Sequence, residues 1–496
     1  MGARRKRQRA DAARPVRRVS TVLPGSADDP GAPLRGVDEL VEFFRTAEKP
    51  RAQFRVGTEH EKFGFLRADH RPLPYHGPQG IEALLRAIAD DDEERRVGAW
   101  TPVEDGGHVI ALYRADGSIT LEPGGQLELS GAPLSTIHET CAEVGRHLCL
   151  LRRLCLPRGI GFIGMGFHPT ARWDEMPTVP KARYAVMERY MPTVGARGVD
   201  MMKRTATVQA NFDWASEDDM VRSFAVALRA APLVAALFAN SPFVEGRPSG
   251  VLSERQRVWA DTDPRRAGFP AVVLEPGFGY RRWVECVLDV PMYFVRRDGV
   301  HHDVAGASFR TFLREGLLVG GTRVQATQRD FADHLTTVFF EVRLKRVLEV
   351  RAADCGPWSR ICALPALHKG LLYDPTARDQ AAELLDFLDA DALVRLRADV
   401  LVRGYRAESA RGPILPLCER LLDIAAGGLA RLCCRDAAGR DETRFLRPLV
   451  ESVALGQTFA ERLLALLRDK WQGDLSRIWE EVEFFHEDET AELVSR

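Results

Sequence analysis

The chain has 496 residues, of which 45% are hydrophobic, and its 69 Lys and Arg residues nearly balance its 70 Asp and Glu residues. The net charge of -1 gives no global basic field that would indicate nucleic-acid binding, and the absence of about 18 uninterrupted apolar residues argues against a membrane span. Nine cysteines dispersed over so long a chain are typical of reduced thiols in a cytoplasmic protein.

The first 22 residues differ from the rest because they carry eight basic side chains against a single acid, Asp11. Three interpretations fit such a segment: a transit-like presequence, a nucleic-acid-binding arm or a disordered extension. Its composition favours disorder, and the Pro, Gly and Asp content of residues 26–36 predicts a linker. We therefore expect residues 1–36 to precede the folded unit, and an organellar location only if the basic segment is a transit peptide.

Residues 55–65 alternate between polar and apolar side chains as a β-strand does. Successive side chains of a strand point to opposite faces, so Glu59 and Glu61 lie side by side on one face. Their carboxylates repel each other unless a cation lies between them. His60 and Lys62 point to the other face, and for that reason His60 is not among the predicted metal ligands.

A predicted hairpin follows in residues 109–122, with its turn at residues 116–117. Glu122 ends its second strand. Residues 126–130 alternate next and place Glu128 on one face with two further polar side chains. Carboxylates thus recur on predicted strands and not on predicted loops.

Residues 347–351 repeat this pattern far downstream and place Glu349 and Arg351 on one face. Taken singly, each glutamate is best explained as the solvent-facing side of a half-buried antiparallel strand. That explanation weakens when four such strands pair the acid with Gly, Gln or Arg. Carboxylate oxygens of this kind suit Mg²⁺ or Mn²⁺ better than zinc. Because magnesium usually binds together with phosphates, these strands indicate a site for ATP.

Residues 136–156 have the spacing of a long amphipathic helix, with Ser135 available as its N-cap. Residues 159–164 then fit the pattern GxGxxG, but a dinucleotide motif must follow a strand and open a helix. This one follows a helix and leads into a strand-like stretch, so its glycines are better explained by close approach of a neighbouring strand or ligand. Helical spacing also occurs in residues 37–47, 80–89 and 218–239.

Residues 204–212 alternate so that one face carries only hydroxyl and amide side chains, including Gln209 and Asn211. An uncharged polar stripe suits a floor that hydrogen-bonds a ligand, although a sheet face covered by water would have the same pattern.

Residues 253–266 contain four Arg, two Asp and one Trp. Arginine binds carboxylates through a planar fork, which recognition of an amino acid would require, and a surface ion-pair cluster is the open alternative.

From about residue 364 onward the pattern is helical and rich in Leu and Ala. Strands followed by helices predict an α+β protein in which one antiparallel sheet is covered by helices on its outer side. We expect a single domain over residues 37–496, with the sheet in a core at about 37–363 and a helical region at about 364–496.

Seven segments carry long ordered motifs: GTEHEKFGF at 57–65, LEPGGQLELSGAPL at 121–134, MGFHP at 165–169, the run 180–269, DVPMYF at 289–294, EVRLKR at 341–346 and EVRAADCGPW at 349–358. Together they resemble the glutamate–cysteine ligases of the plant and proteobacterial type. The likeness extends from about Asp38 to Glu480, and motifs of this length at the family's spacing make it specific.

This resemblance implies a curved, glutamine synthetase-like sheet that forms a funnel with the active site inside. The implied activity is ATP-dependent ligation of glutamate, through a γ-glutamyl phosphate, to the amino group of cysteine, the first step of glutathione-type thiol synthesis. A related carboxylate–amine ligase with a different amine acceptor is the alternative. ATP and Mg²⁺, or Mn²⁺ in its place, are the implied cofactors. Expected partners are small-molecule substrates, with no nucleic acid and no membrane, and the chain is expected to be a monomer or homodimer.

The resemblance also implies roles for particular residues. The implied metal ligands are Glu59, Glu61, Glu122, Glu128 and Glu349. Arg351 stabilises the transferring phosphoryl group together with Glu349, and the implied substrate-binding residues are Arg255, Arg266, Gln209, Asn211 and Trp259. One reversible disulfide, between Cys141 and Cys362, is implied as well, and the alternative is two buried thiols that never pair.

Overall fold

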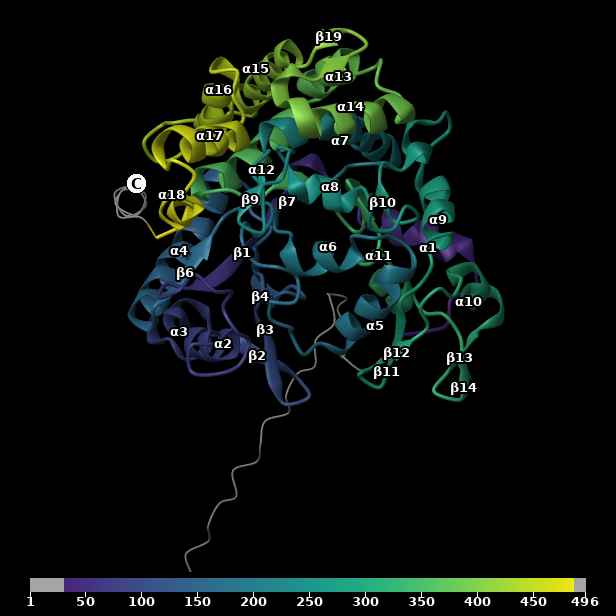
Figure 1. Cartoon of the computed structure of the whole chain (residues 1–496). Coiled ribbons are helices and arrows are strands. Elements are labelled where there is room, and N and C mark those ends of the chain that lie inside the picture. The colour runs from purple at the N-terminus through teal and green to yellow at the C-terminus, as the bar shows by residue number, and fades with distance from the viewer. Residues whose placement is uncertain (1–30, 486–496) are drawn as a thin grey trace, which may run out of the picture.

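Nine strands form one sheet in which every pairing is antiparallel (Figure 1). The computed structural model describes residues 31–485 of the chain. The strand order is β16-β17-β7-β1-β5-β4-β3-β2, and β6 pairs with the C-terminal half of β1. The bounds are β1 (Val56–Leu66), β2 (Thr101–Asp105), β3 (His108–Arg114), β4 (Gly117–Leu121), β5 (Leu127–Ser130), β6 (Ile160–Ile163), β7 (Thr207–Phe212), β16 (Val342–Leu344) and β17 (Leu348–Asp354).

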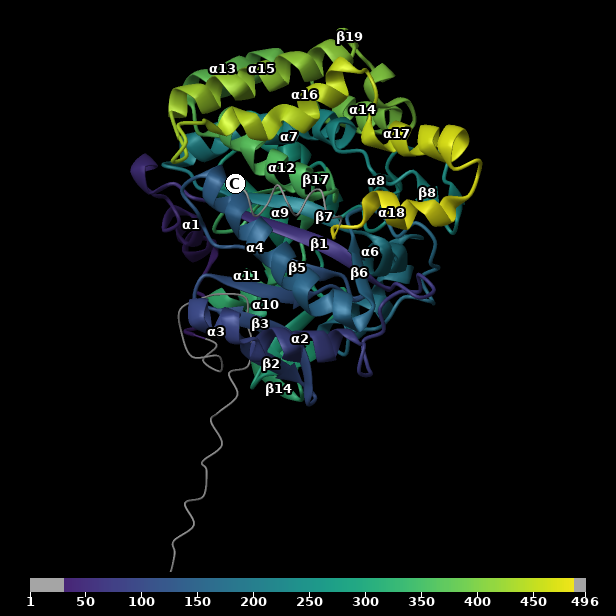
Figure 2. The ribbon, with the colours of Figure 1, turned by 90° about the vertical axis from the view of Figure 1, so that its left-hand side faces the viewer.

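Helices cover one face of this sheet, because that face is apolar. Val208, Ala210 and Phe212 of β7 are fully buried on it. The helices α4 (Ile137–Cys155), α7 (Glu217–Leu237) and α12 (Trp358–Leu372) pack against β1, β7 and β17. Figure 2 shows α13, α15 and α16 stacked outside α7 and α12, with the sheet below them. The expected α+β architecture, one antiparallel sheet with helices outside it, is therefore confirmed.

The helical C-terminal region forms most of this outermost layer, but its last helix, α18, packs against the sheet, where the ring of Trp479 lies 4.7 Å from that of Phe65 on β1. Its helices are α13 (Pro375–Leu384), α14 (Ala390–Arg403), α15 (Leu415–Leu432), α16 (Arg447–Ala454), α17 (Phe459–Ala465) and α18 (Ile478–Val482), with a small hairpin of β18 (Glu408–Ser409) and β19 (Gly412–Pro413). One continuous cluster of buried apolar side chains runs from Leu40 in the first helix to Phe485. The C-terminal helices therefore share a core with the sheet.

Most of the remaining elements lie at the sides of the sheet or opposite its polar face, whereas α2 packs against α4 and β3 and continues the outer layer (Figure 1). The helices are α1 (Val37–Arg45), α2 (Ile81–Asp90), α3 (Asp92–Gly98), α5 (Ala182–Tyr190), α6 (Gly198–Arg204), α8 (Glu254–Trp259), α9 (Tyr280–Leu288), α10 (Phe309–Glu315) and α11 (Gln328–Leu335). The strands are β8 (Phe243–Val244), β9 (Arg247–Pro248), β10 (Ala267–Gly268), β11 (Phe294–Arg297), β12 (Val300–Asp303), β13 (Leu317–Val319), β14 (Thr322–Val324) and β15 (Phe339–Phe340).

Two local expectations need correction. The turn of the β3–β4 hairpin lies at Ala115 and Asp116, one residue earlier than expected, because Gly117 already pairs with Arg114 as the first residue of β4. The N-cap of α4 is Thr136 and not Ser135. The Thr136 hydroxyl accepts the backbone N–H of Glu139, and the Glu139 carboxylate accepts the N–H of Thr136, which is a capping box.

Two of the three glycines of the GxGxxG segment permit close contacts, as expected, whereas a Cβ at Gly159 would lie 3.7 Å from its nearest neighbour. A Cβ added to Gly161 would lie 2.3 Å from the Phe65 ring, and one added to Gly164 would lie 2.4 Å from the carbonyl oxygen of Gly356. Gly161 belongs to β6, which pairs with β1 at Phe65.

α7 is long and apolar enough to cross a membrane by length and composition alone, which the expectation of no span did not foresee. However, 78% of its most apolar window is buried inside the protein. α7 is therefore a core helix on the apolar face of the sheet.

Candidate active site

The second face of the sheet is polar and forms the floor of a cavity of about 280 Å³. On β1, Glu59 lies opposite Gln209 of β7 on one side and opposite Ser130 of β5 on the other, and Glu61 lies opposite Glu128. Because directly opposed residues share a face, the carboxylates of two strands meet over the sheet. The walls come from loops and helices opposite, including α5, α6, α8 and the β11–β12 hairpin.

The carboxylates on this floor repel one another. Burial, followed by the charges of Glu349 and Glu128, raises the pKa of Glu59 to about 7. Burial and the neighbouring carboxylates of Glu122 and Glu128 raise the pKa of Glu61 well above its ordinary value, and burial with Glu122 raises that of Glu128 as well. A buried group of like charges is expected to bind cations, since a cation restores the ionised form.

Glu349 is the exception among these acids. Burial alone would raise its pKa, but the side chains of Arg343, Lys345 and Arg351 outweigh burial and hold the pKa well below its usual range. Its Oε1 accepts from Arg343 Nε at 2.9 Å and from Arg351 Nη1 at 2.5 Å, and Lys345 contacts its other oxygen. Glu349 therefore organises a cluster of three cations at one end of the floor.

Arg351 joins this cluster to the polar stripe on β7. Its Nη1 donates to Gln209 Oε1 as well as to Glu349, and its guanidinium lies 5.9 Å from the ring of Trp259. Gln209, Trp259 and Arg351 all line the cavity. Asn211 lies on the same face and donates to Glu59 Oε1 at 2.8 Å, but it is not a lining residue.

The two expected substrate arginines lie in different places. Arg255, on α8, lines the cavity and donates from Nη2 to the carbonyl oxygen of Arg351 at 2.9 Å. Its Nε and Nη1 are buried and have no hydrogen-bond partner among the described residues. Arg255 thus keeps donors for an anionic ligand at the boundary of the cavity.

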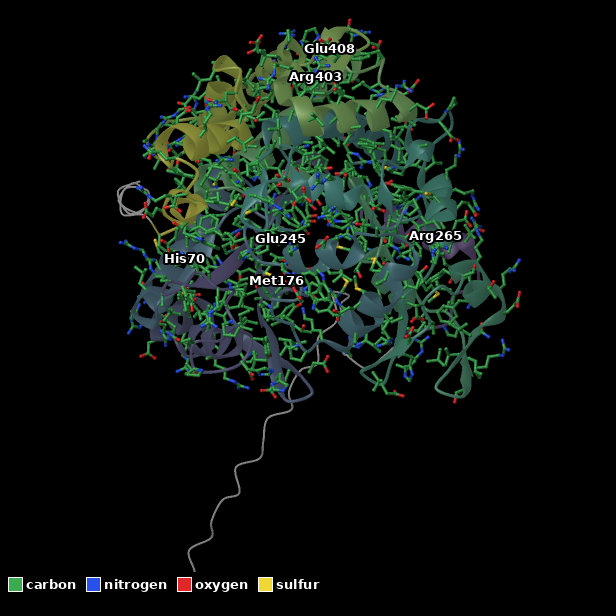
Figure 3. The ribbon with its side chains drawn as sticks, viewed as in Figure 1. His70, Met176, Glu245, Arg265, Arg403 and Glu408 are labelled. Atoms are coloured by element: carbon green, nitrogen blue, oxygen red, sulfur yellow. The ribbon has the colours of Figure 1, made fainter. Side chains whose placement is uncertain are left out.

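Arg266 does not reach the cavity. Its three guanidinium nitrogens donate to Asp263, to the Thr337 carbonyl and to the Pro291 carbonyl, and the guanidinium lies 3.9 Å over the ring of Tyr293. The side chain is fully buried, so its fork is already occupied and the structure gives no support for direct substrate contact by Arg266. Its exposed neighbour Arg265, labelled in Figure 3, donates to the hydroxyl of Tyr190.

Several functional candidates were missed by sequence reasoning. Arg343 lies opposite Glu349 in the β16–β17 pairing, and the EVRLKR motif that contains Arg343 and Lys345 could have revealed them. Lys181 also lines the cavity and donates to the carbonyl oxygen of Leu121 at 2.9 Å, and burial lowers its pKa to about 7. No strand pattern marks Lys181, because it precedes a short helix.

His60 and Lys62 lie on the opposite face of β1, as their alternation predicted. Both are fully buried, Lys62 Nζ lies 3.0 Å from His60 Nδ1, and the His60 ring packs against the ring of His147 on α4. Neither side chain lines the cavity.

Cys141 on α4 and Cys362 on α12 lie together among the helices that cover the apolar face of the sheet. Their sulfur atoms are 2.7 Å apart, and both are buried free thiols. Burial, followed by Cys141, raises the pKa of the Cys362 thiol well above its ordinary value, which disfavours the thiolate needed for oxidation. The expected partners are thus adjacent, and the disulfide itself stays a prediction.

Comparison with known proteins shows which family the chain belongs to. The model of the family described as glutamate–cysteine ligase family 2 matches residues 55–481. A chloroplastic glutamate–cysteine ligase from Medicago truncatula is 42% identical over 444 residues, which cover 90% of this chain and 84% of that protein. The chloroplastic enzyme from Arabidopsis thaliana is 43% identical over 446 residues, with coverage of 90% and 82%.

Among solved structures, a glutamate–cysteine ligase from Francisella tularensis in complex with AMP matches with a TM-score of 0.48 and 12% identity. It covers 84% of this chain and 85% of that one. A likeness of this degree is too low to support an inference about the site.

Proposed function

Because this chain belongs to glutamate–cysteine ligase family 2, we propose that it joins the γ-carboxylate of L-glutamate to the amino group of L-cysteine, using ATP. The products are γ-glutamylcysteine, ADP and phosphate, and the reaction is the first step of glutathione-type thiol synthesis. The observation that best supports this function is the cavity floor itself. It brings a group of buried carboxylates, which a bound cation would keep ionised, next to two arginines that can bind phosphate.

The first chemical step converts a poor electrophile into a good one. An oxygen of the glutamate γ-carboxylate attacks the γ-phosphorus of ATP, the bond to the bridging oxygen breaks, and ADP leaves a γ-glutamyl phosphate behind. We assign Arg351 to the transferring phosphoryl group, because its always-charged planar fork is oriented by both Glu349 and Gln209. A charge held in place before the reaction stabilises the transition state without reorganisation.

In the second step the neutral amino group of cysteine attacks the acyl carbon, an amide forms and phosphate leaves. Neither step uses a serine or cysteine side chain of the protein as a nucleophile. The protein contributes by positioning the amino group next to the acyl phosphate, since an acyl phosphate that reacts with water first is lost to hydrolysis.

The donors on the cavity floor fit Mg²⁺. The proposed ligands are hard oxygens. Four of them, the carboxylates of Glu59, Glu61, Glu122 and Glu128, line the cavity, whereas the fifth, that of Glu349, is fully buried and does not line it. When bound, Mg²⁺ would neutralise phosphate charge. Within residues 31–485 these acids do not form a compact group of three with ligand atoms inside 4.8 Å. Phosphate oxygens of ATP would have to supply further ligands, as they usually do for magnesium. The contacts of Glu349 with three cations favour its second role, the orientation of Arg351.

We propose that Arg255 binds a substrate carboxylate, because it lines the cavity with two unused donor nitrogens. Gln209 and Trp259 would form the adjacent wall, and Asn211 would act through its hydrogen bond to Glu59. For Arg266 we propose a positioning role, since it ties the segment after α8 to the Thr337 and Pro291 carbonyls.

The test is ADP release coupled to a spectrophotometric readout, with glutamate, ATP and Mg²⁺ supplied and cysteine present or omitted. ADP release that depends on cysteine and yields γ-glutamylcysteine by mass spectrometry supports the proposal. Turnover with another amine but not with cysteine would instead indicate a related carboxylate–amine ligase.

The proposed substrates are small molecules, and we propose no nucleic-acid or membrane partner. We also propose that the chain is a monomer or a homodimer, which light scattering distinguishes. The relatives described above are chloroplastic by name. We propose a cytoplasmic location here unless the basic N-terminal segment is a transit peptide; residues 1–30 lie outside the described residues. A fluorescent protein fused behind residues 1–36 that entered an organelle would contradict the cytoplasmic location.

A further inference from the structure

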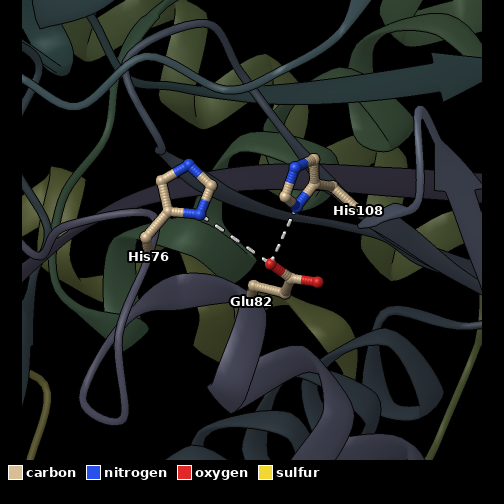
Figure 4. Close-up of side chains that lie close together, drawn as sticks. All are labelled: His76, Glu82 and His108. Carbon is tan, nitrogen blue, oxygen red and sulfur yellow. Dashed lines mark hydrogen bonds and ion pairs between the residues drawn. The ribbon is translucent and has the colours of Figure 1, made fainter.

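Three side chains with metal-binding chemistry converge at a second place, outside the cavity (Figure 4). They are His76, in the loop before α2; Glu82, in the first turn of α2; and His108, the first residue of β3. One ligand atom from each lies within 4.8 Å of the others. None of the three lines the cavity of the candidate active site.

The Glu82 carboxylate is oriented so that one oxygen faces the two imidazoles. Its Oε2 lies 3.2 Å from His108 Nδ1 and 4.0 Å from His76 Nδ1. The other oxygen, Oε1, accepts from Arg86 at 2.8 Å and from the backbone N–H of Val109 at 3.3 Å. The outer partners therefore fix the carboxylate through Oε1, which is how supporting hydrogen bonds orient metal ligands. Oε2 faces the two imidazoles and shares a hydrogen bond with His108 Nδ1, which a bound metal ion would replace.

The backbone that carries the three residues is tied together. The buried Tyr75 donates its hydroxyl to the Val109 carbonyl at 2.9 Å, which links the loop to the residue after His108. The N–H of Glu82 donates to the Tyr75 carbonyl at 3.1 Å. A Cβ at Gly80 would lie 2.5 Å from the His76 carbonyl oxygen, so the tight turn that places His76 beside α2 requires glycine there.

We propose that His76, Glu82 and His108 bind a zinc ion, with water completing the coordination. Two imidazoles and one carboxylate suit zinc and related transition metals, whereas magnesium and calcium prefer sites made of oxygen. With zinc–ligand bonds of about 2.0–2.1 Å, tetrahedral ligand atoms are about 3.3 Å apart. The Glu82–His108 separation already matches that value, and the His76 side chain, which is 66% exposed, is free to close the remaining gap. The ion would join the loop before α2 to the start of β3.

The experiment is calorimetric titration of the full chain with Zn²⁺, after chelator treatment and in the presence of excess Mg²⁺. The wild type should bind one zinc ion per chain. His76→Ala, His108→Ala and Glu82→Gln should each weaken zinc binding by about 100-fold or more, since loss of an outer partner alone typically costs 10–100-fold. His76→Ala is the safest variant for the fold, because that side chain is mostly exposed.

Two matched controls should bind zinc as the wild type does. Glu104→Gln removes an acid that contacts Arg86 at 3.6 Å but is not in the trio, and His138→Ala removes a histidine on α4 that packs against Phe445. Co²⁺ in place of zinc should give the visible absorption of a nitrogen- and oxygen-ligated ion. A thiolate charge-transfer band that disappears in Cys433→Ser would instead assign binding to that exposed cysteine and overturn the proposal. Equal zinc affinity in His76→Ala, His108→Ala and the wild type would overturn it as well.

Discussion

Replacing Glu61 by Gln should change catalysis and stability in opposite directions. Glu61 lies opposite Glu128 across β1 and β5, and such opposed side chains have Cβ atoms about 5 Å apart. At an effective dielectric constant of about 20, two unit charges at about 5 Å repel by about 3 kcal/mol. Because the raised pKa of Glu61 already relieves part of this repulsion through protonation, we expect the metal-free variant to gain about 1–3 kcal/mol in unfolding free energy.

The stronger of the two local hydrogen bonds should survive this substitution, whereas the weaker one, from Gln209 Nε2 to Glu61 Oε1 at 3.5 Å, would be lost. Glu61 Oε2 accepts the backbone N–H of Thr207 at 3.0 Å, and the remaining amide oxygen of glutamine can accept the same donor. Turnover should fall by about two orders of magnitude or more, which corresponds to about 2.7 kcal/mol, the loss typical of a group that acts on developing charge. The measurements are kcat at saturating Mg²⁺ and denaturant unfolding without metal.

The pH dependence of stability gives an independent check. Since the folded-state pKa of Glu61 is raised above its ordinary value of 4.5, the stability of the metal-free wild type should fall as pH rises from about 4.5 through the folded-state pKa. The stability of metal-free Glu61→Gln should fall less than that of the wild type over the same pH range. Glu143→Gln is the matched control: Glu143 is a buried glutamate on α4 that accepts the Ala132 N–H at 2.9 Å and does not line the cavity, so kcat should be unchanged. Near wild-type turnover in Glu61→Gln, or a destabilised metal-free variant, would refute this reasoning.

Three further outcomes are expected. Arg351→Lys should lose about 100-fold or more in kcat, because an ammonium cannot contact Gln209 and a phosphoryl oxygen as a planar fork can; a variant that kept most of its rate would show that charge alone suffices. Deleting residues 1–22 removes no proposed site residue, so kcat should be unchanged, and an inactive but folded truncation would contradict that. Oxidation should join Cys141 to Cys362 and raise the unfolding free energy by several kcal/mol, and peptide mapping should find a cross-linked peptide that is absent from Cys141→Ser. Absence of that peptide from the oxidised wild type would refute the bridge. Unchanged activity when dithiothreitol is added to the bridged protein would refute its regulatory role.

The two-residue period of strands was enough to assign faces. Glu59 and Glu61 share the polar face and His60 the buried one, because that distinction depends only on local alternation. The pairing of Glu61 with Glu128 did not follow from periodicity, since register depends on how separate strands meet. The expectation that these strands share one site came instead from the motifs that resemble the ligase family.

Arginine roles were harder to predict, because they depend on partners distant in the chain. Arg266 and Arg255 belong to the same Arg-rich segment, yet Arg266 is occupied by carbonyls 25 and 71 residues away and only Arg255 reaches the cavity. Arg343 escaped notice because its importance comes from lying opposite Glu349 in the β16–β17 pairing. Tertiary contacts of this kind leave no periodic trace in the sequence.

The most direct test of the proposed chemistry follows the oxygen of the glutamate γ-carboxylate. Glutamate labelled with heavy oxygen at that carboxylate is incubated with the enzyme, ATP, Mg²⁺ and cysteine, and the released phosphate is analysed by mass spectrometry. Attack of the carboxylate on the γ-phosphorus predicts one labelled oxygen in each phosphate released, in proportion to the γ-glutamylcysteine formed. Formation of γ-glutamylcysteine with unlabelled phosphate would contradict a γ-glutamyl phosphate intermediate and the role assigned to Arg351.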